Sequence, residues 1–376
     1  MAPVELASDV PATLVLGYHT AVRILNDPDR FPADPRNWQK SLPADHPLRP
    51  MLEWRPNPLR TAGKEHAFYR DALNHALSVV DLHAVRKHTI RVAAELINQF
   101  CRNGDAELIE DYITPVVITV LNETVGCPAG IGNRLRPAFA AMFEGVNTDE
   151  VNAQVASGLF ELIENKRRDP SNDIASVLVH DCPGLSDEER MSQLVTIYSA
   201  CIEPVRNLIA NTMRRMLTDP RYRPDTAQFT PPVRDVVKET LANDPPMANL
   251  CNSYPRQPVL IDGVWLPADQ PVLVSMAAAT TDPAIVGNKG WTDNNSHLAF
   301  GSGPHACPHI AREMSQQIAV EAIAHFFDAL PEAELAVGVD EVLWRPGPFH
   351  RAPAAVPVDF PPTPPLPIPV GPASRK

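Results

Sequence analysis

The sequence lacks any uninterrupted apolar run of about 18 residues, the length that a membrane-spanning helix needs. Its N-terminal segment, MAPVELASDV, carries acidic side chains where a secretory signal would carry basic ones, which favours a cytoplasmic protein. Positive charge is also scarce, because 33 Lys and Arg stand against 45 Asp and Glu, for a formal net charge of −12. Nucleic acids and anionic membranes would repel this chain, so neither is an expected partner.

Cysteine is sparse and scattered. The six cysteines show no C-x-x-C spacing, so we expect free thiols in a reducing compartment and neither a disulfide framework nor a zinc site. Proline, in contrast, is abundant, at 41 of 376 residues. Its densest run, PPTPPLPIPVGPASRK, predicts an extended C-terminal tail over residues 361–376, after a single domain over residues 1–360.

Helical patterns dominate the middle of the chain. Residues 65–100 predict two helices, and residues 192–217 predict one long, largely apolar helix that crosses the centre of the protein. Pro204 should kink this helix, because proline has no N–H and clashes with the preceding turn. Strand patterns are fewer, and one pair flanks Asp262-Gly263, which predicts a hairpin. The expected fold is mainly α with a small β portion.

A loop with two glycines, FGSGPHAC at residues 300–307, precedes the last long helical pattern. The glycines allow a tight turn with the backbone close to a flat ligand. Cys307 then stands at the beginning of a helix expected near Pro308. The unpaired N–H groups and the positive end of that helix would stabilise a thiolate, the form of cysteine that binds iron.

This loop resembles the haem-binding loop of the cytochrome P450 family, Phe-Gly-x-Gly-x-His-x-Cys-x-Gly, except that His309 replaces the last glycine. The resemblance implies the P450 fold, with haem b between the central long helix and the helix that follows the loop. It implies that Cys307 is the axial iron ligand, that Phe300 and Gly301 lie against the haem, and that His305 binds a haem propionate.

A second stretch, GKEHAFYR at residues 63–70, is similar to the family's helix that binds the haem propionates. Its spacing puts His66 and Arg70 on one helix face, and two cationic donors suit a pair of carboxylates. The family's propionate arginine, which lies further along the chain, falls on Asn252 in an ungapped match. Arg256, four residues later, is the candidate substitute.

Two other family motifs are altered. In the central helix an acid and an alcohol relay protons for oxygen activation, and here they read Glu203-Pro204-Val205. The acid survives but neither hydroxyl does, so we expect slow or uncoupled oxygen chemistry. The Glu-x-x-Arg motif keeps Glu239 but has Ala242 at the arginine. Because an isolated buried carboxylate is costly, we expect Glu239 to find other donors or to lie near solvent.

Two further positions depart from the family pattern. The arginine that usually completes the Glu-x-x-Arg group falls on Thr292, so both cations are missing together, as in a minority of actinobacterial P450s. Pro308 follows the expected iron ligand and removes one N–H that could donate to its sulfur. Fewer donors should leave more charge on the thiolate and lower the reduction potential of the iron.

The sequence leaves three functions open. The first is a haem-thiolate monooxygenase for a small or medium organic substrate, with electrons from a ferredoxin-type donor and Glu203 as the remaining proton-delivery group. The second is a peroxide-using enzyme in which Glu203 is the general acid and base. The third is a degenerate homologue that binds haem, or a partner protein, without turnover.

Overall fold

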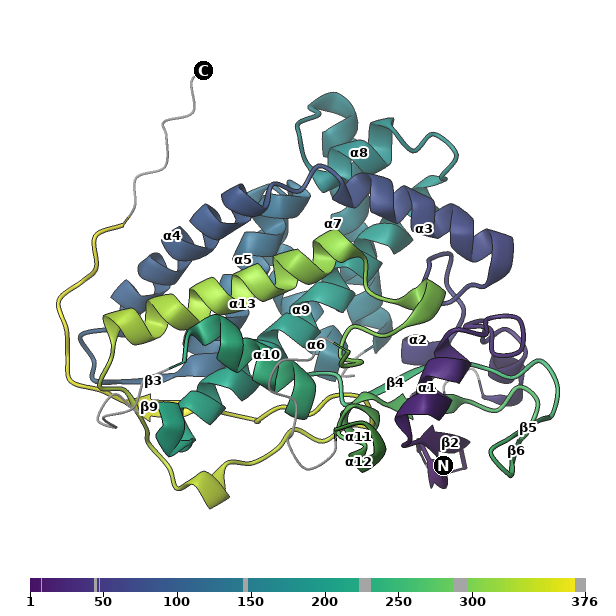
Figure 1. Ribbon diagram of the computed structural model, residues 1–376. Coiled ribbons are helices and arrows are strands. Elements are labelled where there is room, and N and C mark those ends of the chain that lie inside the picture. The colour runs from purple at the N-terminus through teal and green to yellow at the C-terminus, as the bar shows by residue number, and fades with distance from the viewer. Residues whose placement is uncertain are drawn as a thin grey trace.

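The computed structural model describes residues 1–7, 9–43, 46, 48–144, 148–222, 231–286 and 296–368. Helices form most of this part, and small sheets lie at its lower edge (Figure 1). The longer helices are α1 (Tyr18–Leu25), α3 (Gly63–Leu77), α4 (Leu82–Phe100), α5 (Thr114–Val125), α6 (Ala129–Glu144), α7 (Thr148–Arg168), α8 (Ile174–His180), α9 (Asp187–Thr218), α10 (Val233–Asn243) and α13 (His309–Ala329). The short ones are α2 (Arg49–Leu52), α11 (Met276–Thr280) and α12 (Pro283–Val286). The mainly α fold expected from the sequence is confirmed.

Helix α9 runs through the centre of the molecule and packs against α13, which lies along α4 (Figure 1). It begins at a capping box, in which Ser186 and Glu189 each accept a backbone N–H of the other. Most of its residues are buried on all sides, as predicted for residues 192–217. The two helices predicted over residues 65–100 are α3 and α4.

The strands form small sheets within the described residues. Their bounds are β1 (Ala2–Glu5), β2 (Pro11–Val15), β3 (Asp105–Glu107), β4 (Asn249–Ser253), β5 (Val259–Ile261), β6 (Val264–Leu266), β7 (Val272–Ser275), β8 (Glu334–Leu335) and β9 (Pro357–Asp359). Strand β7 joins β2 in parallel and β4 in antiparallel pairing. The hairpin of β5 and β6 turns at Asp262 and Gly263, whose φ angles of 49° and 78° suit its type of turn. The predicted hairpin is confirmed.

Glu239, on α10, has found other donors. It accepts hydrogen bonds from Arg215 Nη1 at 3.0 Å, at the end of α9, and from Arg221 Nη2 at 2.9 Å. Tyr222 Oη donates to its second oxygen at 2.5 Å. The expectation from the sequence is confirmed, and this carboxylate ties α10 to α9. Ala242 is buried on the same helix, and Thr292 lies outside the described residues.

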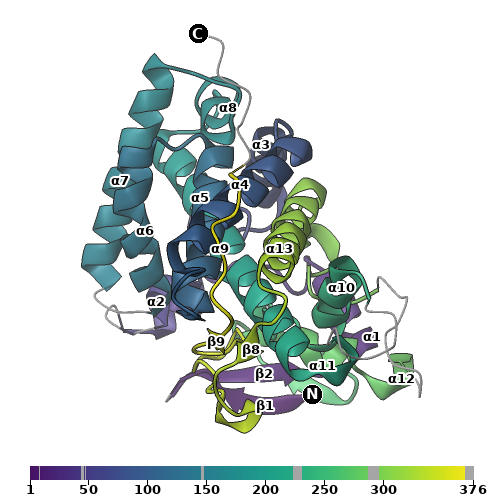
Figure 2. The ribbon, with the colours of Figure 1, turned by 90° about the vertical axis from the view of Figure 1, so that its left-hand side faces the viewer.

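The proline-rich segment lies against the protein over residues 361–368 and crosses α4 (Figure 2). Both hydrogen-bonding groups of the Asn98 side chain bind the backbone of Leu366, at 3.0 Å to its oxygen and 2.7 Å from its nitrogen. Thr363 N also donates to Cys101 O at 2.8 Å. Thr363 and Leu366 are half-buried while the prolines between them are exposed, which is the three-residue period of polyproline II.

Replacing Asn98 with Ala should release this segment. Two backbone hydrogen bonds would be lost, so the free energy of unfolding should fall by about 1–2 kcal/mol. Urea unfolding of the full chain measures the change. Asn133→Ala, an exposed position on α6 with no described hydrogen bond, is the control and should leave the stability unchanged. Equal stabilities of the Asn98 variant and the wild type would contradict the docking.

The Glu239 cluster should make stability depend on pH. Burial opposes the charged form, but the bonds from Tyr222 and Arg221 outweigh it, so the pKa of Glu239 lies below its ordinary value. A lowered pKa stabilises the fold above the pKa of the unfolded chain, and the gain is lost as the pH falls through the native pKa. At neutral pH, Glu239→Gln should therefore cost on the order of 1 kcal/mol, measured by urea unfolding.

The difference between Glu239→Gln and the wild type should close as the solution becomes more acidic than the native pKa. Glu332→Gln, at an exposed glutamate after α13, should show no comparable difference at any pH. A penalty for Glu239→Gln that stays constant down to strongly acid pH would mean that its charge contributes nothing.

Candidate functional site

Cys307 lies directly before α13, and Pro308 is the residue that caps this helix. The backbone N–H of Cys307 donates to Phe300 O at 2.8 Å, which closes the loop on itself. The predicted order of glycine loop, cysteine and helix is confirmed. Cys307 is half-buried and its thiol is free.

The two glycines of the loop have a conformational role. Gly301 and Gly303 both have a φ of 72°, where side chains are strained. A Cβ at Gly303 would lie 2.2 Å from the backbone oxygen of Leu25, at the end of α1. Only glycine therefore fits at this position, and the loop can pack closely on α1.

The chemistry of Cys307 depends on its surroundings. Burial raises the pKa of its thiol to about 11, although Arg312 and Arg70 act in the opposite direction. The protein alone thus keeps the sulfur protonated at neutral pH. A metal cation reverses this, since coordination deprotonates a thiol. Within the described ranges, no group of three or more His, Cys, Asp or Glu could hold a metal ion.

His66, Arg70 and His305 come together beside Cys307, as the sequence predicts. The rings of His66 and His305 lie 4.1 Å apart between centroids. His305 Nδ1 is 3.0 Å from Pro58 O, and Arg70 Nη2 donates to Ala306 O. Three segments of the chain therefore converge on one small volume next to the cysteine.

This cluster has ring nitrogens without partners. The Nε2 atoms of His66 and His305 are buried, and neither has a hydrogen-bond partner in the described part of the chain. Burial lowers the pKa of His305 to about 4, with help from His66, Arg70 and Arg60. Burial and Arg70 also lower the pKa of His66. In a neutral His305 whose Nδ1 donates to Pro58 O, Nε2 carries no proton, but a carboxylate beside it favours the protonated ring. With Arg70, the two unpaired ring nitrogens can therefore hold a pair of carboxylates, such as the propionates of haem.

Helix α9 has an exposed residue in its middle. Ala200 is exposed although it stands in the middle of α9, between the buried Tyr198 and Cys201. Burial raises the pKa of the Cys201 thiol, and the nearby Cys307 raises it further, so this part of α9 lies near the cysteine loop. A flat cofactor between α9 and the loop therefore fits the residues present. Phe300 borders the loop and stacks under Arg312, whose Cζ is 5.2 Å from its ring centre.

Glu203 is buried one turn after Ser199 and is held by cations. Arg345 Nη1 lies 2.5 Å from its Oε1, and Arg206 Nη1 lies 3.4 Å from its Oε2. Asn207 Nδ2 donates to Oε1 at 3.0 Å. Burial opposes the charge, but Arg345 and Arg206 prevail, so the pKa of Glu203 lies below its ordinary value.

Arg256 is the one predicted cofactor residue that the structure does not bring to the cluster. It is exposed, and its Nε donates to Asp29 O at 3.0 Å. An exposed guanidinium engaged with a surface carbonyl does not support the predicted propionate contact, which corrects that expectation. The side chain of Asn252 lies outside the described residues.

The main partner that sequence reasoning missed is Arg345. It lies 142 positions from Glu203 along the chain, in the segment after α13, and no spacing rule joins two residues so far apart. Its neighbour Trp344 shows where the segment is held, because Arg214 and Arg351 lie over its ring at 5.0 and 4.4 Å. A signal would have been the arginine directly after tryptophan in a segment otherwise rich in proline and glycine.

Comparison with known proteins gives a consistent family. No family model matches the chain. The cytochrome P450 monooxygenase PikC of Streptomyces venezuelae is 28% identical over 92% of this chain and 84% of its own length. The vitamin D(3) 25-hydroxylase of Pseudonocardia autotrophica is 25% identical over 88% of this chain and 85% of its length.

Solved structures share the fold. CYP154C4 from a Streptomyces species superposes with a TM-score of 0.85 at 23% identity, over 95% of this chain and 91% of its own. The myxobacterial cytochrome P450 CYP267B1, in complex with myristic acid, gives a TM-score of 0.81 at 24% identity, over 96% and 93%. In the described part of this chain no helix has the length and apolarity to cross a bilayer. Together with the cysteine loop and the cluster beside it, these matches show that the chain has the cytochrome P450 fold and is similar to bacterial cytochromes P450 over most of its length.

Proposed function

We propose that this protein is a haem-thiolate monooxygenase for a small or medium organic molecule. The observation that supports this most is the placement of Cys307 directly before α13 and within electrostatic reach of Cys201 on α9, where the neighbouring Ala200 is exposed. Relatives over most of the chain are named monooxygenases and hydroxylases, including PikC and the vitamin D(3) 25-hydroxylase. We infer the same class of reaction here.

The chain's own residues would bind and orient the cofactor. Cys307 would bind the iron through its sulfur, while His66, Arg70 and His305 would hold the propionates of haem b. The haem supplies the oxygen-activating and electron-accepting chemistry when it is bound. Pro308 offers no N–H to the sulfur, so the thiolate would keep more negative charge than in relatives with another residue there.

We infer that Glu203 is a positioning residue and not the main proton donor. Its carboxylate is paired with Arg345 and Arg206, and a group with a lowered pKa holds no proton at neutral pH. This argues against the peroxide-using alternative, which needs Glu203 to exchange protons. Its contacts instead connect the centre of α9 to the segment after α13.

The substrate and the electron donor are proposed from relatives. Mycinamicin IV hydroxylase/epoxidase and 6-deoxyerythronolide B hydroxylase are similar to this chain, so we propose a secondary metabolite of that kind. A ferredoxin-type protein would supply electrons. Pro304 and His309 are exposed on either side of Cys307, which leaves the loop within reach of a donor.

Reconstitution tests the proposed function. The purified haem protein, a bacterial ferredoxin, its reductase and NADPH should hydroxylate at least one macrolide or steroid that shifts the haem spin state. Absence of product with this system and with hydrogen peroxide would favour the non-catalytic alternative. Turnover with peroxide alone that is lost in Glu203→Gln would favour the peroxide alternative.

Loss of the propionate donors should loosen the haem. In His66→Ala and Arg70→Ala, a charged group of the cofactor would lose one hydrogen bond, so haem transfer to apomyoglobin should be roughly tenfold faster or more. His75→Ala is the matched control, since His75 is exposed on the same helix. Transfer rates equal to the wild type in both variants would contradict the assignment of the cluster.

A hydroxyl at position 204 should improve coupling. Pro204→Thr would restore a side chain that can hold water and pass protons beside Ala200. We expect a several-fold higher fraction of NADPH electrons in product, with less hydrogen peroxide released. Pro204→Ala removes the proline without adding a hydroxyl and is the control. If both variants change coupling equally, the missing hydroxyl is not the limiting feature.

A further inference from the structure

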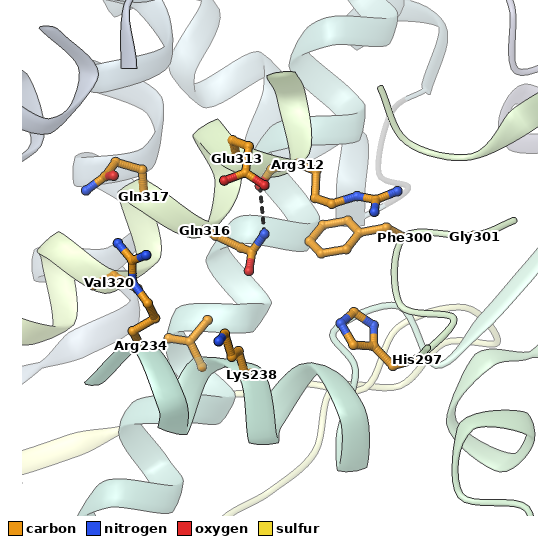
Figure 3. A pocket seen from close by; sticks show the side chains of 11 residues that line it. Arg234, Lys238, His297, Phe300, Gly301, Arg312, Glu313, Gln316, Gln317 and Val320 are labelled. Atoms are coloured by element: carbon orange, nitrogen blue, oxygen red, sulfur yellow. Dashed lines mark hydrogen bonds between the residues drawn. The ribbon is translucent and has the colours of Figure 1, made fainter. Parts of the chain in front are cut away.

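A second pocket lies behind the cysteine loop, between α10 and α13 (Figure 3). Its volume is about 280 Å³, close to the lower end for small-molecule sites, roughly 300–1,000 Å³. Helix α10 forms one wall, α13 the opposite wall, and the start of the loop closes one end. The side chains used below are Arg234, Lys238, His297, Phe300, Arg312 and Glu313.

The charge of this pocket is opposite to that of the whole chain. Arg234 and Lys238 stand four residues apart on one face of α10, and Arg312, from α13, lies over the ring of Phe300 at the other end of the pocket (Figure 3). Glu313 is the only acid in the lining and is exposed. Three cations against one acid leave two positive charges, in a protein whose net charge is −12.

These cations have no acidic partner in the described part of the chain. No ion pair joins Arg234, Lys238 or Arg312 to a described carboxylate, whereas most other arginines that border a helix contact one. Arg312 lies over the ring of Phe300. Lys238 and Arg234 extend from α10 toward the gap (Figure 3). Arg234 and Lys238 are exposed, so water screens their mutual repulsion, and a bound anion would reduce it further.

Buried polar atoms at the same place also lack partners. Arg312 Nε and His297 Nδ1 are buried without a hydrogen bond among the described residues. Leaving such a donor unsatisfied costs roughly 1–3 kcal/mol. Gln316 uses its amide nitrogen to donate to Arg312 O at 3.4 Å (Figure 3). A ligand rich in acceptor oxygens would satisfy the free donors.

We propose that this pocket binds a small anion with two adjacent phosphate groups, the chemistry of a diphosphate or of a nucleoside diphosphate. Two positive charges in excess match a multiply charged anion. Guanidinium groups from two sides match tetrahedral oxygens that point in several directions. The volume exceeds what one carboxylate requires. The site is separate from the cysteine cluster and does not depend on the proposed oxygenation.

An anion bound in the pocket should change the electrostatic environment of Cys307. Arg312 lies over the ring of Phe300, and the backbone oxygen of Phe300 accepts the N–H of Cys307 at 2.8 Å. An anion on Arg312 would cancel positive charge close to the sulfur. With haem bound, the midpoint potential should therefore become more negative. This consequence, unlike the binding itself, rests on the haem-thiolate assignment.

Calorimetric titration of the full-length holoprotein with pyrophosphate, in a low-salt buffer free of phosphate, tests the proposal. We expect one saturable site. Arg234→Gln combined with Lys238→Gln should weaken it at least tenfold, because two charge-assisted contacts are lost. Glu313→Gln should tighten it, because the only opposing charge is removed. Arg102→Gln is the control and should leave the affinity unchanged, because Arg102 is an exposed arginine in the turn after α4 and does not line the pocket.

Three results distinguish diphosphate binding in this pocket from other causes of the calorimetric signal. Oxalate, with two carboxylates, should bind at least tenfold more weakly than pyrophosphate, and equal binding would contradict the phosphate assignment. Absence of saturable binding, or binding that the double variant leaves intact while its haem content and circular dichroism stay native, would overturn the site. Binding of an acidic ferredoxin that the double variant weakens, without any binding of pyrophosphate, would also overturn it, since the pocket would then serve a protein partner.

Discussion

The hydrogen bond from the N–H of Cys307 to Phe300 O holds the structure's reactive sulfur in place. This bond requires the chain to turn back within a few residues, and the left-handed glycines at 301 and 303 allow it. Gly303 also lets the loop approach α1 at a distance that no side chain permits. The sulfur consequently stands at the mouth of α13, and α13 is fixed by α4 and α9. The position of every other group at the site is defined relative to this loop.

Two carboxylates of the core show how the chain compensates for the family motifs that it lacks. Glu239 has no arginine one turn away on α10, yet Arg215, Arg221 and Tyr222 all bind it from the end of α9. Glu203 is likewise held by Arg345. Glu203 is buried and Glu239 is half-buried, and each keeps its charge because cations from other segments face it, which avoids the cost of an unpaired ion. The altered motifs are therefore parts of a consistent structure.

Most of the correct predictions from the sequence came from residues that are close together along the chain. The glycine loop, Cys307, and the spacing of His66 and Arg70 are contiguous or one helical turn apart, and the structure brings them together as expected. The partners of Glu203 and Glu239 could not be predicted from the sequence, because they come from segments that only tertiary packing brings near. Arg256 failed for the same reason: its position in the chain suggested a propionate donor, but the fold puts it on the surface.

The central claim is that Cys307 is a thiolate ligand to haem iron, and one spectrum tests it most directly. Carbon monoxide added to the reduced holoprotein should give the strongly red-shifted Soret band of thiolate-ligated haem, and Cys307→His should abolish that band while the protein still binds haem. A wild-type spectrum without the red shift, or the same band in Cys307→His, would contradict the account.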